Sequence, residues 1–127
     1  MSRKVISTKN APKAVGPYSQ AIVSNGFVFT AGQIPINPAS GKIETTDFKA
    51  QVRQDLENLS QVMEAAGSSM QNIVKLTVFM TDLAEFSKLN DVFMEIFPDN
   101  QPARSAVQVS RLPLDALVEI EAVATLE

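Results

Sequence analysis

The sequence predicts a two-layer α+β domain in which two helices pack on one face of a single mixed β-sheet. Its 127 residues are the length of one ordinary domain, so we assign residues 1–127 to a single domain. Two segments carry apolar residues at helical spacing, and short apolar segments lie before, between and after them. Two amphipathic helices are enough to cover one face of one sheet, which favours this arrangement.

The first predicted element is a β-hairpin. Residues 19–24 and 27–31 are short apolar segments that flank Asn25 and Gly26. Asn-Gly is the strongest two-residue hairpin signal, because both residues tolerate the positive φ angles of a tight turn. Residues 33–42 are rich in Pro, Asn and Gly, which predicts turns that lead from the hairpin to the next element.

A long helix is predicted to begin at residue 48. Thr46 or Asp47 can cap its start, and Gly67 can end it in a left-handed conformation. Its apolar positions recur every three or four residues, as expected for one helical face: Phe48, Val52, Leu56, Leu59, Met63 and Ala66.

A second helix is predicted after Asp82 and Glu85, whose spacing is that of a capping pattern, and Pro98 stops it. Its expected buried residues again follow helical spacing: Phe86, Leu89, Phe93 and Phe97.

Three further strands are predicted at residues 73–80, 103–109 and 118–126. The alternation in residues 73–80 places apolar side chains on both faces of the strand, with Val74, Leu76, Val78 and Met80 on one side and Ile73 and Phe79 on the other. The two predicted helices can cover only one face of the predicted sheet. An apolar second face is usually buried by another subunit, so we expect an oligomer.

The composition excludes several classes of site. The chain has Cys 0 and His 0, which rules out disulfides, zinc fingers, thiol nucleophiles and Ser-His-Asp triads. No apolar run reaches the length of a membrane span, and we expect a cytoplasmic protein. Mitochondrial delivery by a missing presequence is the alternative. Residues 1–43 hold five basic residues and no acid, but the formal net charge is -3, so nucleic-acid binding is not expected.

Arg104, Glu119 and Glu121 are the residues that suggest chemistry. Arg104 lies on a strand face, where its guanidinium can bind a carboxylate or phosphate, although a salt bridge to Glu119 or Glu121 is the simpler interpretation. The two glutamates alternate along one strand, about 7 Å apart on one face. Such a pair can perform acid–base chemistry or bind a metal, but a solvated strand edge is the interpretation that the pattern favours.

Five motifs occur in order along the chain: Gly16-Pro17-Tyr18-Ser19-Gln20, Gly32-Gln33-Ile34-Pro35, Val74-Lys75 through Val78-Phe79 with Asp82-Leu83, Pro102-Ala103-Arg104-Ser105, and Glu119-Ile120-Glu121-Ala122. Together they resemble the Rid family of reactive-intermediate deaminases, also called the YjgF or L-PSP endoribonuclease family. The resemblance covers nearly the whole chain, from about residue 11 to residue 124.

This resemblance implies a chorismate-mutase-like fold of the bacillus type, assembled as a homotrimer with its sites in clefts between subunits. It also implies hydrolysis of enamines and imines such as 2-aminoacrylate and 2-iminobutyrate, which pyridoxal-phosphate dehydratases release, to 2-keto acids and ammonia. The implied partners are this small-molecule substrate and two further copies of the chain. No cofactor and no metal are implied, and no membrane is involved.

The resemblance also implies roles for individual residues. Arg104 would hold the substrate carboxylate, and Glu119 would orient or deprotonate the attacking water and relay a proton to nitrogen. Tyr18 and Asn90 would line the cleft, and main-chain groups around Gly32 would contact the ligand. Glu121 would support the site or the trimer.

Two positions depart from the family pattern. Ala31 stands where many relatives have Ser, and Ala106 stands where many have Cys. Because Arg104 and Glu119 are retained, we expect deaminase activity, while the two departures leave the substrate preference open. The alternatives are an RNA-directed activity, as an endoribonuclease or translation inhibitor, and a non-catalytic sensor or holdase that uses the same cleft.

Overall fold

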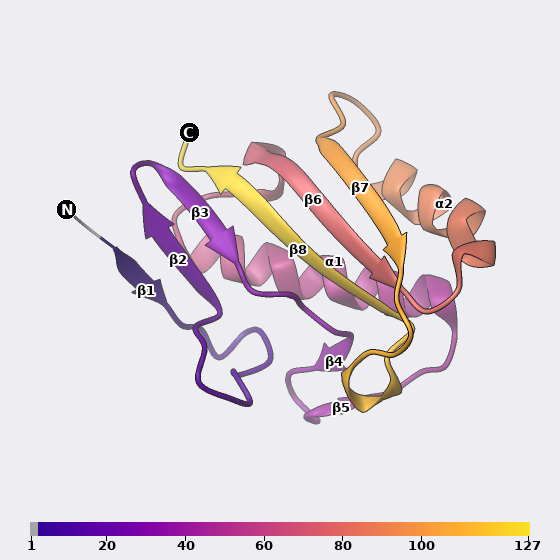
Figure 1. The fold of residues 1–127 in the computed structure, drawn as a ribbon. Coiled ribbons are helices and arrows are strands. Elements are labelled where there is room, and N and C mark those ends of the chain that lie inside the picture. The colour runs from indigo at the N-terminus through magenta and orange to yellow at the C-terminus, as the bar shows by residue number, and fades with distance from the viewer. Residues whose placement is uncertain (1–2) are drawn as a thin grey trace.

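The computed structural model describes residues 3–127, which form an α+β fold with one mixed sheet and two helices (Figure 1). The six strands lie in the order β1, β2, β3, β8, β6, β7, and β6 and β7 run parallel while the other neighbours run antiparallel. Their bounds are β1 (Lys4–Ile6), β2 (Ala21–Ser24), β3 (Phe27–Thr30), β6 (Ile73–Met80), β7 (Ala103–Gln108) and β8 (Val118–Thr125). The helices are α1 (Phe48–Ala65) and α2 (Phe86–Ile96), and β4 (Ile36–Asn37) pairs with β5 (Lys42–Ile43) in a small second sheet.

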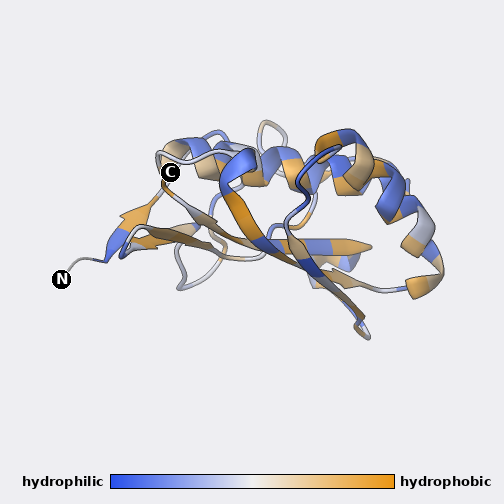
Figure 2. Cartoon of the chain, turned by 90° about the horizontal axis from the view of Figure 1, so that it is seen from above, coloured by the Kyte–Doolittle hydropathy of each residue, from blue (hydrophilic) through white to orange (hydrophobic). Residues whose placement is uncertain are grey.

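Both helices cover the same face of the main sheet (Figure 2), as the sequence predicts. The core lies between these two layers, where residues such as Leu59 of α1, Leu89 of α2 and Ile120 of β8 are fully buried. On the other face, apolar side chains remain accessible in this single chain: Phe29 is 46% exposed and Val107 is 44% exposed. These side chains are available for contacts with another molecule.

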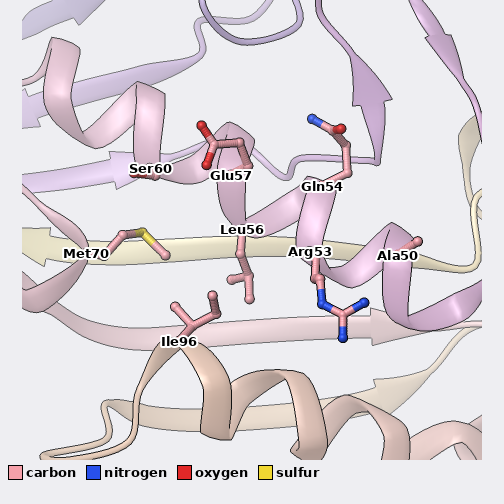
Figure 3. Close-up of a pocket in the computed structure, with 8 residues that line it drawn as sticks. All are labelled: Ala50, Arg53, Gln54, Leu56, Glu57, Ser60, Met70 and Ile96. Atoms are coloured by element: carbon pink, nitrogen blue, oxygen red, sulfur yellow. The ribbon is translucent and has the colours of Figure 1, made fainter.

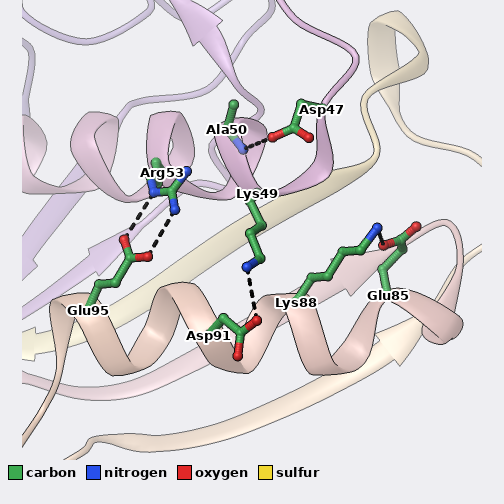
Figure 4. Close-up of polar contacts among 8 residues, drawn as sticks. All are labelled: Asp47, Lys49, Ala50, Arg53, Glu85, Lys88, Asp91 and Glu95. Carbon is green, nitrogen blue, oxygen red and sulfur yellow. Dashed lines mark hydrogen bonds and ion pairs between the residues drawn. The ribbon is translucent and has the colours of Figure 1, made fainter.

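The two helices are joined across their outer surface by two ion pairs (Figure 4). Lys49 Nζ lies 2.9 Å from Asp91 Oδ2, and Arg53 binds Glu95 through Nε and Nη2. Each pair links α1 to α2 at the surface, where such contacts add little stability. The buried apolar faces of the helices are therefore the main source of their association.

The predicted hairpin and first helix are confirmed. Asn25 and Gly26 adopt positive φ angles of 52° and 80°, which the tight turn between β2 and β3 requires. At the start of α1, Asp47 is the cap, since its Oδ2 accepts a 2.9 Å hydrogen bond from Ala50 N. Gly67, with a φ of 84°, follows the end of the helix.

The second helix differs from its prediction at the N-terminal end. Asp82 caps a short 3₁₀ turn, Leu83–Glu85, and α2 begins only at Phe86. Phe86 was expected in the core but is 40% exposed, because it occupies the first turn of the helix at the margin of the sheet. The predicted stop is confirmed, since the helix ends just before Phe97 and Pro98.

The two faces of β6 also differ from the predicted alternation. A register irregularity between Ile73 and Lys75 shifts the pairing with β8, so Ile73 and Leu76 both point to the core. Val74 is consequently 45% exposed and does not share the buried face of Leu76. The simple alternation of side chains holds only from Lys75 onward.

Three short strands were not predicted. β1 has three residues and β4 and β5 have two each, which is too short for an alternating apolar pattern to be detected. β4 and β5 lie within the turn-rich residues 33–43. Within residues 3–127, no helix combines the length and the apolar character needed to cross a bilayer.

The cap of α1 gives a stability prediction. We expect Asp47→Ala to lower the free energy of unfolding by about 1 kcal/mol, because Ala50 N loses its acceptor. Thr46→Ala is the matched control, since Thr46 is the neighbouring exposed candidate and should change stability little. Urea unfolding of both variants measures this. Equal losses would show that the Asp47 carboxylate is not the cap that stabilises α1.

Candidate active site

The predicted site residues form two groups on opposite faces of the sheet. Arg104 in β7 is level with Leu76 of β6, whose side chain is buried beneath the helices, so Arg104 points to the helix side. Glu119 in β8 pairs with Phe79 and alternates with the buried Ile120, so it points to the face without helices. Three residues of β6 separate the two levels, which is about 10 Å along the strand. One chain therefore does not bring Arg104 and Glu119 together.

The Arg104 group consists of Arg104, Phe86, Asn90, Phe93 and Ala106. Arg104 Nη2 donates a 2.8 Å hydrogen bond to Asn90 Oδ1 of α2. Its guanidinium carbon lies 5.2 Å from the ring centroid of Phe86 and 4.8 Å from that of Phe93. Two aromatic rings and one amide thus fix the guanidinium in a partly desolvated position. Ala106 lies two residues farther along β7, on the same face.

No carboxylate in residues 3–127 forms an ion pair with Arg104, so the predicted salt bridge to Glu119 or Glu121 is wrong. The reason is the register of β8 with β6, which puts those glutamates on the other face. Burial lowers the pKa of Arg104 from its ordinary value, but an arginine stays charged at neutral pH. The guanidinium lies beside a cavity of about 350 Å³ that Asn90, Phe93 and Pro102 also line. It is suited to bind a small anion.

The Glu119 group consists of Glu119, Glu121, Ala31 and Gly32. Gln33 and Ile120 exchange two main-chain hydrogen bonds, of 2.8 Å and 3.1 Å, which hold the segment after β3 against β8. This pairing brings Gly32 under the side chain of Glu119. A Cβ atom at Gly32 would lie 2.9 Å from Glu119 Cγ and would overlap the carboxylate, so only glycine leaves Glu119 in this position.

Burial raises the pKa of Glu119 above its ordinary value, and the neighbouring charge of Glu121 raises it further. A carboxylate with a raised pKa is a better general base near neutral pH. The interpretation of this pair as a solvated strand edge is wrong, because β8 lies between β3 and β6 in the sheet. Within residues 3–127, no three acidic side chains gather closely enough to form a metal site.

Within residues 3–127, Tyr18 forms no hydrogen bond with a residue of either group. It lies in the loop between β1 and β2, is 50% exposed, and accepts a 3.3 Å hydrogen bond from Val15 N through its hydroxyl. Ala31 lies beside Gly32 and donates its N–H to the carbonyl oxygen of Gln20 at 2.9 Å.

Several residues that shape the site were not predicted to do so. Phe86 and Phe93 were expected as core residues, and their stacking on Arg104 depends on the position of β7 beside α2. On α1, the buried Gln51 accepts from Leu117 N at 2.9 Å, and the buried Asn58 donates to Ile36 O at 3.0 Å. In the sequence, a polar residue at a position of the apolar helical face is the signal that could have identified Gln51 and Asn58.

A larger hollow of about 500 Å³ lies on the outer surface between α1 and α2 (Figure 3). It contains none of the predicted site residues. Its lining residues are Ala50, Arg53, Gln54, Leu56, Glu57, Ser60, Met70 and Ile96. Arg53 is already bound to Glu95 at its rim, so size alone does not identify this hollow as the site.

Comparisons with known proteins identify the family. The family model described as Endoribonuclease L-PSP matches residues 8–126. A solved Rid family protein of Yersinia pestis, YyfA, has a TM-score of 0.95 and 48% identity, covering 98% of this chain and 99% of its own. The chain belongs to the Rid family.

Other Rid proteins are similar over the same length. A RutC family protein of Pyrococcus horikoshii is 53% identical over 122 residues, which is 96% of this chain and 97% of the relative. Reactive Intermediate Deaminase A, chloroplastic, of Arabidopsis thaliana is 41% identical over 99% of this chain and 67% of its own length. The structure of Escherichia coli TdcF with bound serine has 46% identity and a TM-score of 0.90, covering 96% of this chain and 98% of that chain.

The carboxyl pair in β8 gives a prediction about protonation. We expect Glu121→Gln to lower the pKa of Glu119, because it removes the negative charge that opposes ionisation of Glu119. Titration of the Glu119 side-chain carboxyl by ¹³C NMR measures this. Glu57→Gln, an exposed substitution on α1, is the control and should leave the titration unchanged. A titration of Glu119 that is the same in both variants would contradict the coupling.

Proposed function

We propose that this Rid protein hydrolyses 2-iminobutyrate, 2-aminoacrylate and similar imines and enamines to 2-keto acids and ammonia. The observation that carries the proposal is the Arg104 guanidinium, which Phe86, Phe93 and Asn90 hold without a carboxylate partner in residues 3–127. An ordered, unpaired guanidinium is suited to the carboxylate of an imino acid. The name of the Arabidopsis relative, a reactive intermediate deaminase, and the serine bound to TdcF support this substrate class.

We further propose that the active site forms between two copies of the chain in a homotrimer. Arg104 and Glu119 lie on opposite faces of one sheet, so a single substrate cannot contact both in one chain. The Arg104 group lies at the β7 edge, and the Glu119 group lies on the face where Phe29 and Val107 remain accessible. Packing the edge of one chain against the open face of the next would bring the groups together, with Tyr18 lining the same cleft.

The proposed reaction needs binding, water placement and proton transfer, and no cofactor. Arg104 binds the substrate carboxylate and sets the imine carbon beside Glu119. Glu119 takes a proton from water as the water oxygen bonds to the imine carbon, and the C=N electron pair moves to nitrogen, which receives that proton from Glu119. In the resulting carbinolamine, Glu119 transfers the hydroxyl proton to the amine nitrogen, the carbonyl forms as the C–N bond breaks, and the nitrogen leaves as ammonia. Proton transfer by Glu119 is worth about 10²- to 10⁴-fold in rate.

The description of the family as an endoribonuclease, with the five basic residues before residue 44, favours an RNA-directed activity as the second candidate. RNA binding through these residues would weaken steeply with added salt. Binding that is insensitive to salt would remove this candidate. Ligand binding without turnover would instead indicate a sensor or holdase.

The deaminase proposal is tested by coupling a threonine dehydratase to the protein and measuring release of 2-ketobutyrate. We expect the wild-type protein to accelerate release, and Glu119→Gln to lower kcat by about 10²-fold or more. Arg104→Ala should mainly raise KM, because the carboxylate contact is lost. Arg111→Ala is the matched control, since Arg111 is an exposed arginine whose guanidinium is bound to Asp115. Unchanged turnover in Glu119→Gln would contradict the assigned base.

The shared site is tested by mixing. Arg104→Ala and Glu119→Gln chains are unfolded together at equal concentration and refolded. If each site takes Arg104 from one chain and Glu119 from its neighbour, random association restores about one quarter of the wild-type sites. Each variant refolded alone should remain impaired. A mixture no more active than the separate variants would place both residues of each site in one chain.

A further inference from the structure

A further cavity lies between the loop that follows β1 and the turn that joins β4 to β5 (Figure 1). Its volume is about 350 Å³, and its walls are formed by residues 7–15 and residues 36–41. A cavity of this size can hold a small molecule. No residue of the Arg104 group or the Glu119 group lines it, so it is a separate candidate binding site.

A buried amide side chain fixes the first wall of this cavity. Gln20 is 5% exposed, and its side chain forms hydrogen bonds with the main chain of the loop. Its Oε1 accepts from Thr8 N at 2.7 Å, and its Nε2 donates to Thr8 O at 3.1 Å and to Pro12 O at 2.8 Å. These bonds satisfy main-chain groups that no helix or strand would satisfy. The loop therefore has one defined conformation.

A second buried amide fixes the opposite wall. Asn58 of α1 is fully buried, and its Nδ2 donates to Ile36 O at 3.0 Å. In the turn between β4 and β5, Gly41 N donates to Asn37 O at 2.8 Å, and Asn37 Oδ1 accepts from Ala39 N at 2.8 Å. Both walls are thus in place without a ligand, which lowers the entropic cost of binding one.

The lining of the cavity defines the chemistry of a ligand that fits it. Lys9 and Lys13 line the cavity, neither forms an ion pair within residues 3–127, and no acidic side chain of these residues lines it. Most of the other lining residues are apolar: Ala11, Pro12, Val15, Ile36 and Pro38. Apolar walls with two free ammonium groups are complementary to a ligand that has an apolar body and an anionic head.

The two lysines differ in their other surroundings. An adjoining hollow shares Lys9 and Pro38 with the cavity and is also lined by Glu57 of α1. The carboxylate of Glu57 accepts from Gln61 Nε2 at 2.9 Å. Because Glu57 can offset part of the charge of Lys9, we expect Lys13 to contribute more to the binding of an anion.

We propose that this cavity binds a small organic carboxylate, whose oxygens accept hydrogen bonds from Lys9 and Lys13 and whose apolar body packs against Ile36 and the prolines. A carboxylate with a hydrocarbon chain suits the cavity better than inorganic phosphate, because phosphate has no apolar part to bury. The site is distinct from the proposed deaminase site, since it uses other cations and needs no reaction.

The experiment uses the full chain and hexanoate, in an Arg104→Ala background so that binding to Arg104 does not contribute. Isothermal titration calorimetry measures Kd, and amide chemical shifts identify the segments that hexanoate contacts. We expect shifts in residues 7–13 and 36–41. Hexanoate should bind about tenfold more tightly than butyrate, because its two additional methylene groups are buried. Inorganic phosphate should bind more weakly than hexanoate.

Substitutions of exposed lysines complete the test. Lys13→Gln should weaken hexanoate binding more than Lys9→Gln, and the double variant should weaken it about fivefold or more. Lys42→Gln is the matched control, since Lys42 is an exposed lysine of the same basic segment that does not line the cavity. It should leave Kd unchanged.

Three results would overturn the inference. The first is no binding of hexanoate to the Arg104→Ala protein, or shifts confined to other segments. The second is a double lysine variant that binds hexanoate as tightly as Lys42→Gln does. The third is equal binding of hexanoate, butyrate and phosphate, which would remove the apolar contact. Because binding is measured without turnover, a failure of the deaminase proposal would change none of these results.

Discussion

The pairing of β8 is the constraint on which the rest of this structure depends. β8 pairs with β3 on one side and with β6 on the other, and Ile120 also exchanges hydrogen bonds with Gln33. Because side chains alternate along the strand, one set of residues enters the core beneath α1 while Glu119 and Glu121 face the other way. The same strand therefore contributes to the core and presents the carboxylates, and a register slip of one residue would exchange the two roles.

The separation of Arg104 from Glu119 follows from this register. Each group is formed by neighbouring elements of one chain. Residues of α2 hold the guanidinium of Arg104 on the helix side, and the segment after β3 places Gly32 against Glu119 on the other side. The geometry of each group does not depend on the other group. In the assembly that we propose, chemistry depends on chain association although neither group depends on it for its own geometry. Such an arrangement would couple catalytic activity to protein concentration.

Features encoded by neighbouring residues could be predicted from the sequence. Asn25 and Gly26 specify their turn, and the spacing of apolar residues identifies both helices. The sequence left Thr46 and Asp47 open as caps, because the choice depends on which oxygen reaches Ala50 N. The motif resemblance identified the family and gave candidate residues for the chemistry, but it could not show which of these candidates one chain brings together.

What could not be predicted depends on contacts between distant segments. The irregularity near Ile73 arises from pairing with β8, some fifty residues later. The predicted salt bridge of Arg104 is wrong for a similar reason. Alternation shows which side chains of one strand share a face, but it does not show whether Arg104 and Glu119, on different strands, lie on the same face of the sheet. Gln51 and Asn58 are polar residues on the buried face of α1, a pattern that indicates specific contacts, but their partners Leu117 and Ile36 are known only once α1 has packed on the sheet.

The position of β8 has a further consequence for biosynthesis. This strand follows in the chain all the strands it joins, yet it lies between them in the sheet. While the ribosome is still making the segment after β7, β3 and β6 have no strand between them, and the amide of Gln51 has no Leu117 N–H to bind. The nascent chain must therefore wait with its helical apolar faces uncovered until nearly all of the domain has emerged. During that interval the uncovered apolar faces of α1 and α2 can bind chaperones.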